Sequence, residues 1–311
     1  MGGSGGGFFS GRNNPSNLRR LVREADSQAR DEAYETEVSN HIDSLLTQAN
    51  QRDAEAIQTH TSTITEAIEG NIEGSVSLLF GGSVAKHTYV DGLSDVDALV
   101  ILNQSELSGR SPADVKAYFA QCLRERLPQT TVEIGTLAVT VSFSDIAIQL
   151  LPAIRVGQGI KIPQADGSTW SQVIRPERFA NKLTQVNQAT NCKLVPTIKL
   201  AKSILAQLPE NQKLSGYHVE SLAIEVFKSY QGEKTTKAML KHFFIAASRL
   251  IRQPIKDSTG QSVHVDDYLG AADNLSRRIV ADSVARIGRG IQNADNAHSV
   301  SQWKDILGDL P

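Results

Sequence analysis

Apolar residues recur at three- and four-residue spacing over the first part of the chain, which is the period of an amphipathic helix. The positions in this pattern are Leu18, Leu21, Val22, Ala25, Val38, Ile42, Leu45, Leu46 and Ala49. A second helix is expected through Ile57, Ile64 and Ile68. Asp53 would cap its start and Gly70 would end it. This part of the chain is therefore predicted to be helical.

The pattern then changes to short runs rich in β-branched residues, which is typical of strands. Expected strands cover residues 75–80, 96–102, 136–143 and 146–154. Between the second and third of them, Ser111 precedes Pro112 and Asp114. This order of N-cap, first-turn proline and acid predicts a helix that runs to about Leu127.

Helical spacing returns at about residue 175 and continues through the rest of the sequence. Expected helices cover residues 176–190, 193–208, 215–231, 235–252, 271–292 and 300–307. The order of helices, mixed sheet and helices predicts an α+β fold, in which a sheet-containing lobe precedes a helical lobe. We expect a flexible glycine-rich tail at residues 1–17, a core with N-terminal helices at 18–175, and a helical C-terminal lobe at 176–311.

Composition narrows the class of protein. Hydrophobic residues make up 40% and charged residues 21% of the chain, which is ordinary for a globular domain. No apolar run approaches the roughly 20 residues that span a bilayer, and two cysteines make no disulfide framework. We therefore expect a cytoplasmic protein without a membrane partner. With 32 basic and 34 acidic residues, stable binding to long nucleic acid is not expected.

Two acids, Asp95 and Asp97, stand in the apolar run of the second predicted strand. Residues two apart on a strand face the same side, so Val96 and Ala98 would face the core. A buried unpaired carboxylate is costly. Paired acids on a strand therefore favour a divalent cation, Mg²⁺ or Mn²⁺. The alternative is two surface aspartates on a solvated edge strand.

A glycine turn precedes these acids. Gly81 and Gly82 follow the strand SVSLLF, and Ser83 begins a stretch that can form a short helix. Glycines permit close backbone approach, and N–H groups at a helix start bind anionic oxygens. An ordinary strand-to-helix turn would use the same residues. Taken with the acids, the turn predicts one site that binds phosphates and metal, and Lys86 is placed beside it to neutralise substrate charge.

The Gly82-Ser83 turn, eleven residues and then Asp95-Val96-Asp97 resemble the signature of the polymerase-β-like nucleotidyltransferases. The surrounding GGSVAKHTYVDGLSDVDALV is similar to the bacterial cGAS/DncV-like enzymes (CD-NTases), which make oligonucleotide signals in anti-phage CBASS systems. That group is related to oligoadenylate synthetases and archaeal CCA-adding enzymes. The resemblance covers roughly residues 70–225 and implies a nucleotidyltransferase lobe, a helical lobe, and an active site in the cleft between them.

Later segments extend the resemblance. KLVPTIKLAKSIL resembles the helix with a triphosphate-binding lysine, which falls on Lys202, with Lys199 one turn earlier. SGYHVESLA resembles the next helix start, where Ser215 and Tyr217 would meet the nucleotide. The alternatives are a solvated helix edge for the lysines, a helix N-cap for Ser215 and a core position for Tyr217.

The strand IQLLPA resembles the one that carries a third acid, but here that position is Gln149. A glutamine offers a carbonyl oxygen without charge. Three interpretations remain open. Gln149 acts as a neutral ligand, Asp145 substitutes for the acid, or the enzyme is impaired.

The resemblance implies an Mg²⁺-dependent enzyme that joins NTPs, ATP among them, into a cyclic or short linear oligonucleotide second messenger. The reaction would be a two-metal attack of a ribose hydroxyl on an α-phosphate, with release of pyrophosphate. Asp95, Asp97 and Gln149 would be its catalytic residues, and CBASS regulator or effector proteins would be its partners. The alternatives are a CCA-adding-like enzyme that tails RNA, a nucleotide-binding regulator without turnover, and a toxin–antitoxin transferase that modifies a protein.

Overall fold

The computed structural model describes residues 15–51, 54–69, 75–80, 82–91, 93, 96–103, 106–164, 166–256, 258–260 and 265–308. The predicted catalytic residue Asp95 lies outside these ranges. So do Gly81, the predicted helix boundaries Asp53 and Gly70, and residues 1–14 of the predicted tail.

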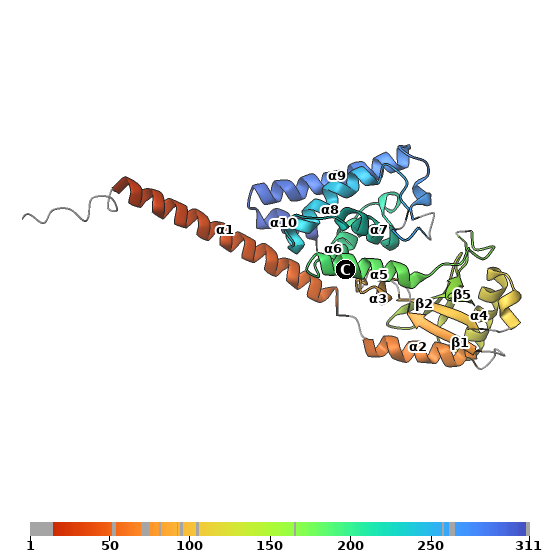
Figure 1. The fold of residues 1–311 in the computed structure, drawn as a ribbon. Coiled ribbons are helices and arrows are strands. Elements are labelled where there is room, and N and C mark those ends of the chain that lie inside the picture. Colours follow the sequence, from red (N-terminus) through yellow and green to blue (C-terminus); the bar gives the residue numbers. More distant parts are fainter. Residues whose placement is uncertain are drawn as a thin grey trace, which may run out of the picture.

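Helices dominate both ends of the chain. They are α1 (Pro15–Gln48), α2 (Ala54–Glu69), α3 (Gly82–Ala85), α4 (Pro112–Arg126), α5 (Pro176–Ala189), α6 (Leu194–Ala206), α7 (Gly216–Phe227), α8 (Thr236–Leu250), α9 (Leu275–Asn296) and α10 (Val300–Leu307). Short 3₁₀ turns are η1 (Glu106–Gly109), η2 (Glu210–Gln212) and η3 (Asp267–Leu269). Figure 1 shows α1 as a long helix whose N-terminal part extends away from the rest of the molecule.

The strands form one mixed sheet. They are β1 (Ser75–Phe80), β2 (Val96–Asn103), β3 (Thr131–Ile134), β4 (Val139–Ser142), β5 (Ala147–Val156) and β6 (Gly159–Lys161). Their order is β1-β2-β5-β4-β3, with β6 paired to β5. The β2–β5 pair is parallel, and the other pairs are antiparallel. The predicted α+β class and mixed sheet are confirmed.

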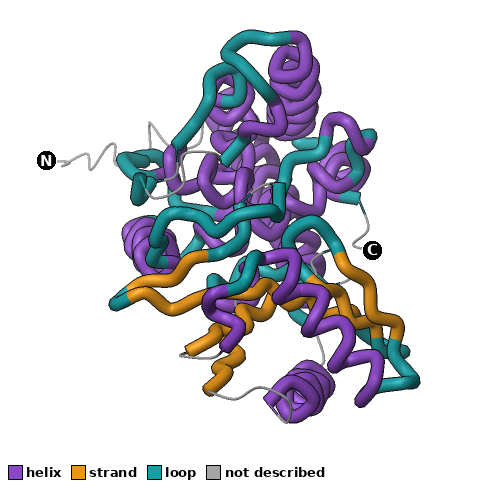
Figure 2. Tube along the Cα trace, turned by 90° about the vertical axis from the view of Figure 1, so that its right-hand side faces the viewer, coloured by secondary structure: helices purple, strands orange, loops and turns teal. Residues whose placement is uncertain are grey.

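One face of the sheet packs against α2 and α4. Alternate residues of β2 and β5, such as Val96, Ala98, Ile148 and Leu150, are fully buried in this core. The alternation of a strand turns Asp97 and Gln149 to the opposite face. Figure 2 shows the strands between the helical lobe above them and α2 below them. Asp97 and Gln149 therefore face the side of the sheet on which the helical lobe lies.

The helical lobe has its own hydrophobic core, made largely by α5 to α10. Tyr34, Val38, Ile42 and Leu45 of α1 belong to this core as well. Helix α1 therefore packs with the C-terminal helices, whereas α2 packs with the sheet. The predicted division of the chain at residue 175 stays a prediction, and α5 begins at Pro176.

The sequence-predicted helices and strands are found within a few residues of their expected bounds, but β3 and β6 are not among the expected strands. In Thr131–Ile134 only Val132 is buried, because β3 is a four-residue edge strand. Its polar and apolar residues alternate, but four residues are at the lower limit of the length over which alternation identifies a strand. Within the described residues, no helix is long and apolar enough to cross a membrane.

Candidate active site

The glycine turn and the second predicted acid are in contact. Gly82 opens α3 with a φ of +50°, a conformation that side chains other than glycine rarely adopt. A Cβ atom built on Gly82 would lie 1.7 Å from Oδ2 of Asp97, so only a glycine lets the turn approach this carboxylate. The structure therefore brings together the predicted phosphate turn and the predicted metal ligand.

Gln149 lies beside Asp97 on the neighbouring strand. The two residues are register partners in the parallel β2–β5 pair, and Thr140 of β4 is the partner of Gln149 on its other side. Both Asp97 and Gln149 are partly exposed. The position that the resemblance assigned to a third acid is thus adjacent to Asp97, with an amide in place of a carboxylate.

Asp145 is directed elsewhere. Its carboxylate lies 3.0 and 3.1 Å from Nε2 of His60 on α2, and this hydrogen bond lowers the pKa of Asp145. Helix α2 packs on the face of the sheet opposite Asp97 and Gln149. The interpretation that Asp145 substitutes for the third acid is therefore wrong.

The donor atoms at this place suit a hard divalent cation. Asp97 offers carboxylate oxygens and Gln149 an amide oxygen, and Mg²⁺ binds oxygen ligands together with substrate phosphates. Across the described part of the chain, no group of three or more His, Cys, Asp or Glu residues could hold a metal ion. Two oxygen donors leave most coordination positions of such a cation to other ligands, such as the oxygens of a triphosphate.

The chain after the glycine turn is folded back tightly. Ser83 is buried in α3, and its carbonyl oxygen accepts a hydrogen bond of 2.9 Å from the N–H of Thr88. His87 has a φ of +58°, which permits this reversal. As a result, Lys86 and Thr88 both reach the same acid on the helical lobe, Glu220.

Glu220 is buried on α7 and binds two of the three lysines of the predicted site, Lys86 and Lys202. One carboxylate oxygen accepts a hydrogen bond from Lys86, and the other accepts from Thr88 and, at 2.8 Å, from Lys202. Nζ of Lys202 also donates to the carbonyl oxygen of Thr88 at 3.0 Å. Three charged side chains from separate segments therefore meet where the two lobes join.

Burial and charge act in opposite directions on these groups. Burial lowers the pKa of Lys202, while Glu220 and Asp97 act to raise it. Burial raises the pKa of Glu220, but the two lysines outweigh it, so the net pKa lies below the ordinary value. Glu220 is therefore an ionised carboxylate at neutral pH, paired with cations.

Tyr217 lies next to this cluster. Its ring is partly buried, and its centroid lies 4.8 Å from that of Phe179 on α5. Nζ of Lys86 lies 5.1 Å from the Phe179 centroid and 5.4 Å from the Tyr217 centroid, within cation–π range. An aromatic pair thus stands beside the lysine that follows the phosphate turn.

Ser215 serves as the N-cap of α7, where its hydroxyl oxygen accepts a hydrogen bond from the N–H of His218. Its own N–H donates to the hydroxyl of Tyr268, at 3.1 Å. The N-cap alternative is therefore confirmed, and a contact between Ser215 and the nucleotide stays a prediction.

Lys199 is separated from Lys202 although both lie on α6. Its ammonium group donates to the side-chain oxygen of Asn50, beyond the end of α1. There it lines a cavity of about 320 Å³ together with Leu46, Ala49, Asn50, His87, Tyr89, Val195 and Pro196. Helix α6 thus directs the two lysines to different partners, and nucleotide binding by Lys199 stays a prediction.

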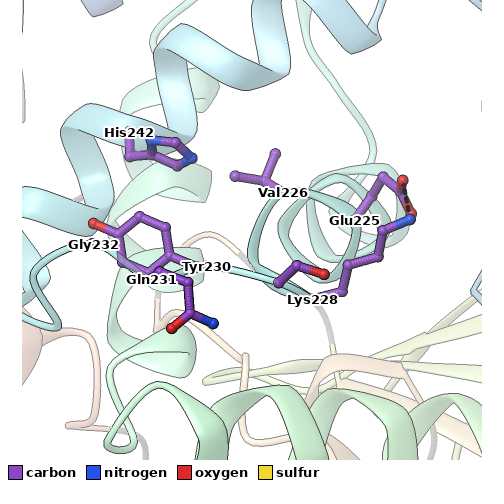
Figure 3. A pocket seen from close by; sticks show the side chains of 8 residues that line it. Glu225, Val226, Lys228, Tyr230, Gln231, Gly232 and His242 are labelled. Atoms are coloured by element: carbon purple, nitrogen blue, oxygen red, sulfur yellow. Dashed lines mark hydrogen bonds and ion pairs between the residues drawn. The ribbon is translucent and has the colours of Figure 1, made fainter.

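A further cavity of about 420 Å³ lies between the end of α7 and α8 (Figure 3). It is lined by Glu225, Val226, Lys228, Ser229, Tyr230, Gln231, Gly232 and His242. An ion pair of 2.6 Å joins Lys228 to Glu225 at its rim. None of the residues predicted for the site lines it, so we place the candidate active site elsewhere, around Asp97 and Lys202.

Sequence reasoning missed Glu220 and Phe179. The available signal for Glu220 was a charged residue inside the apolar run of a helix, VESLAIEVF. Phe179 gave no signal, since it fits the hydrophobic stripe of α5.

Comparison with known proteins adds a family and a fold. A family profile described as the Second Messenger Oligonucleotide or Dinucleotide Synthetase domain (SMODS) matches residues 37–187. No curated protein sequence matches the chain. The structure of Escherichia coli MS115-1 CdnC with ATP is similar with a TM-score of 0.62 at 15% identity, covering 89% of this chain and 97% of that chain.

Two further solved structures are similar. Escherichia coli DncV, in its 3′-deoxy GTP bound form, gives a TM-score of 0.60 at 10% identity over 94% of this chain and 88% of that chain. The Elizabethkingia meningoseptica CdnE cyclic dinucleotide synthase, with GTP and Apcpp, gives a TM-score of 0.56 at 17% identity over 78% of this chain and 92% of that chain. At these identities the likeness concerns the fold.

Proposed function

Since this chain belongs to the bacterial cGAS/DncV-like nucleotidyltransferases (CD-NTases) and carries a second-messenger synthetase domain, we propose that it joins NTPs into a cyclic or short linear oligonucleotide. The observation that carries the proposal is the contact between Gly82 and Asp97. A glycine turn at the start of a helix, beside a metal-type carboxylate, suits a triphosphate with its cation.

In this proposal, each cluster of the site has a separate task. Gly82 and Ser83 bind the β- and γ-phosphates, and the ammonium groups of Lys86 and Lys202 neutralise them. Tyr217 stacks on a base beside Phe179. Asp97 and Gln149 would hold a divalent cation, Mg²⁺ or Mn²⁺, which when bound supplies charge neutralisation to the triphosphate. Asp95 would join them, as its place two residues before Asp97 suggests.

The reaction is a phosphoryl transfer between two nucleotides. A ribose hydroxyl oxygen forms a bond to the α-phosphorus and loses its proton, while the bond from that phosphorus to the bridging oxygen breaks and pyrophosphate leaves. The residues of this chain act by positioning the two nucleotides and neutralising charge, which are the main sources of acceleration in such reactions.

The test is incubation of the full chain with Mg²⁺ or Mn²⁺ and all four NTPs, followed by mass spectrometry. We expect a product with at least one new phosphodiester bond. Recovery of unreacted NTPs alone, with and without a partner regulator, would contradict the proposal. A product formed only on added RNA would indicate the RNA-tailing alternative instead.

Gln149 favours a second candidate function, a nucleotide-binding regulator without turnover. We expect Gln149→Asp to keep or raise the rate of product formation, because a carboxylate next to Asp97 strengthens cation binding. The measurement is initial rate against Mg²⁺ concentration, with Gln149→Ala as the comparison. A strong loss of activity in Gln149→Asp would show a specific role for the amide. NTP binding by calorimetry without any product would favour the regulator.

We also propose the anti-phage CBASS setting that the family resemblance implies, with a regulator or effector protein as partner. One of the similar structures is a complex of Escherichia coli MS115-1 CdnC with HORMA-deltaN. Stimulation of product formation by a co-purified regulator would test this part of the proposal.

A further inference from the structure

Glu220 is an acid placed where the predicted site needs positive charge. It is 1% exposed and lies on α7, in the helical lobe. A buried carboxylate without partners costs several kcal/mol. Here both of its oxygens are used, one by Lys86 and the other by Thr88 and Lys202. The charge is therefore compensated, and the cluster of two lysines and one glutamate keeps a formal net charge of about +1.

The partners of Glu220 come from both lobes. Lys86 and Thr88 follow α3 in the sheet-containing lobe, whereas Lys202 belongs to α6. Lys86 and Glu220 are 134 positions apart in sequence. One carboxylate thus joins the segment after the phosphate turn to two helices of the helical lobe.

Thr88 connects this cluster to the turn itself. Its N–H donates to the carbonyl oxygen of Ser83, and its own carbonyl oxygen accepts from Lys202. Its hydroxyl donates to Glu220. Both backbone polar groups of Thr88 are therefore hydrogen-bonded, the N–H to the turn and the carbonyl oxygen to Lys202. A shift of the Glu220 carboxylate would therefore move Ser83 as well as the two ammonium groups.

We propose that Glu220 is a positioning residue of the nucleotide site, which fixes the ammonium groups of Lys86 and Lys202 and the Gly82-Ser83 turn for the triphosphate. This inference rests on the proposed function, because it concerns the same site. Glu220 itself would not touch the nucleotide. Its role is to hold two cations close together, which their mutual repulsion would otherwise oppose.

Removal of the charge has a defined electrostatic consequence. The charged groups that face Lys202 are Glu220 from α7, Lys86 after α3 and Asp97 from β2. Burial and the charge of Lys86 lower the pKa of Lys202, whereas Glu220 and Asp97 raise it. Because Glu220→Gln removes one of the two groups that raise it, the pKa of Lys202 would fall further. Lys202 would then lose its proton, and its attraction for phosphate, at a lower pH than in the wild type.

The test compares Glu220→Gln with Glu225→Gln in the full chain. Glu225 lies on the same helix but pairs at the surface with Lys228, so its variant controls for a glutamine on α7. The measurement is the dissociation constant of each of the four NTPs with Mg²⁺, by calorimetry between pH 7 and 10, alongside thermal unfolding. We expect Glu220→Gln to bind at least about tenfold more weakly at pH 8 and to lose binding at lower pH than the wild type.

A charge-preserving variant separates positioning from folding. Glu220→Asp keeps the charge on a shorter side chain. We therefore expect weaker NTP binding, with an alkaline limit (the pH above which binding is lost) that matches the wild type. Equal affinities and equal alkaline limits in the wild type and Glu220→Gln would overturn the inference, as would tighter binding by Glu220→Gln. Failure of the wild type to bind any NTP would instead overturn the proposed function on which the inference rests.

Discussion

Gly82 is the residue at which backbone conformation and chemistry are most tightly linked. Its left-handed φ and its contact with Asp97 each favour glycine, and the contact is the stricter requirement. A methyl group at this position would displace the carboxylate or the turn. The position of the turn relative to β2 therefore depends on the absence of a side chain.

We expect Gly82→Ala to reduce product formation by about 100-fold or more, because a displacement of about 1 Å at a reacting centre has effects of that size. The control is Gly157→Ala, since Gly157 also has a positive φ, of +58°, but a Cβ atom there would meet nothing within 4 Å. Both variants should lose about 1–2 kcal/mol of stability from the backbone conformation. Rate measurements and thermal unfolding check this, and equal rates in the two variants would contradict it.

The sequence predicted that Gly82 and Asp97 belong to one site, and the structure brings these two residues into contact. Gly82, Ser83 and Asp97 lie within a short segment whose turn and strand patterns are both readable. Glu220 was missed because Lys86 and Thr88, its partners, lie more than 130 positions away. The contact between Lys199 and Asn50 was also missed, since spacing on one helix does not reveal which distant residue lies within reach of a side chain.

The start of α7 is held by a network between elements. His218 is fully buried, and its Nδ1 lies 2.7 Å from the hydroxyl of Tyr268 in η3. Asp266, which lies 4.0 Å from its Nε2, pairs at 2.7 Å with the buried Arg277 of α9. Burial is the main cause that lowers the pKa of His218, to about 4. The ring is therefore neutral in the folded protein at neutral pH.

This pKa predicts a loss of stability on acidification. In the unfolded chain His218 takes up a proton below about pH 6.5, whereas in the folded protein it does so only near pH 4. The unfolded state binds more protons in between, so stability falls with falling pH by on the order of 3 kcal/mol over that window. We expect the free energy of unfolding of His218→Asn, measured with urea at a series of pH values, to change less over this window. His298→Asn, at an exposed position, should show the same loss of stability as the wild type. A curve that is unchanged in His218→Asn would contradict the assignment.

Helix α1 is tied to the helical lobe by a buried hydrogen bond. Nε1 of the fully buried Trp303 donates to the hydroxyl of Tyr34 at 2.8 Å, and this hydroxyl lies 3.2 Å from Asp295 of α9. Tyr34→Phe would leave the indole N–H without this acceptor. We expect a loss of about 1–3 kcal/mol in urea unfolding.

Tyr230→Phe is the matched control for this loss. The Tyr230 hydroxyl bonds an exposed carbonyl, that of Glu233, so a change within about 0.5 kcal/mol is expected. If Tyr34→Phe is no less stable than Tyr230→Phe, the hydrogen bond between Trp303 and Tyr34 does not stabilise the packing of α1.

At the scale of the whole molecule, the order of elements along the sequence predicted the fold class, since periodicity changes clearly from helix to strand and back. It did not predict that α1 would pack with the C-terminal helices, because an amphipathic face shows that a partner exists without showing which one. The site draws on both lobes, with Asp97 and Gln149 from the sheet and Lys202 and Glu220 from the helices. Its geometry therefore depends on how the lobes meet.

The central claim is that Asp97 belongs to a site that forms phosphodiester bonds. The most direct measurement is the amount of pyrophosphate and of phosphatase-resistant product made from NTPs by the wild type, by Asp97→Asn, and by Asp305→Asn as a surface control on α10. We predict equal molar amounts of pyrophosphate and phosphodiester bonds in the wild type and Asp305→Asn, and neither product in Asp97→Asn. Product formation by a folded Asp97→Asn variant at the wild-type rate would contradict the account.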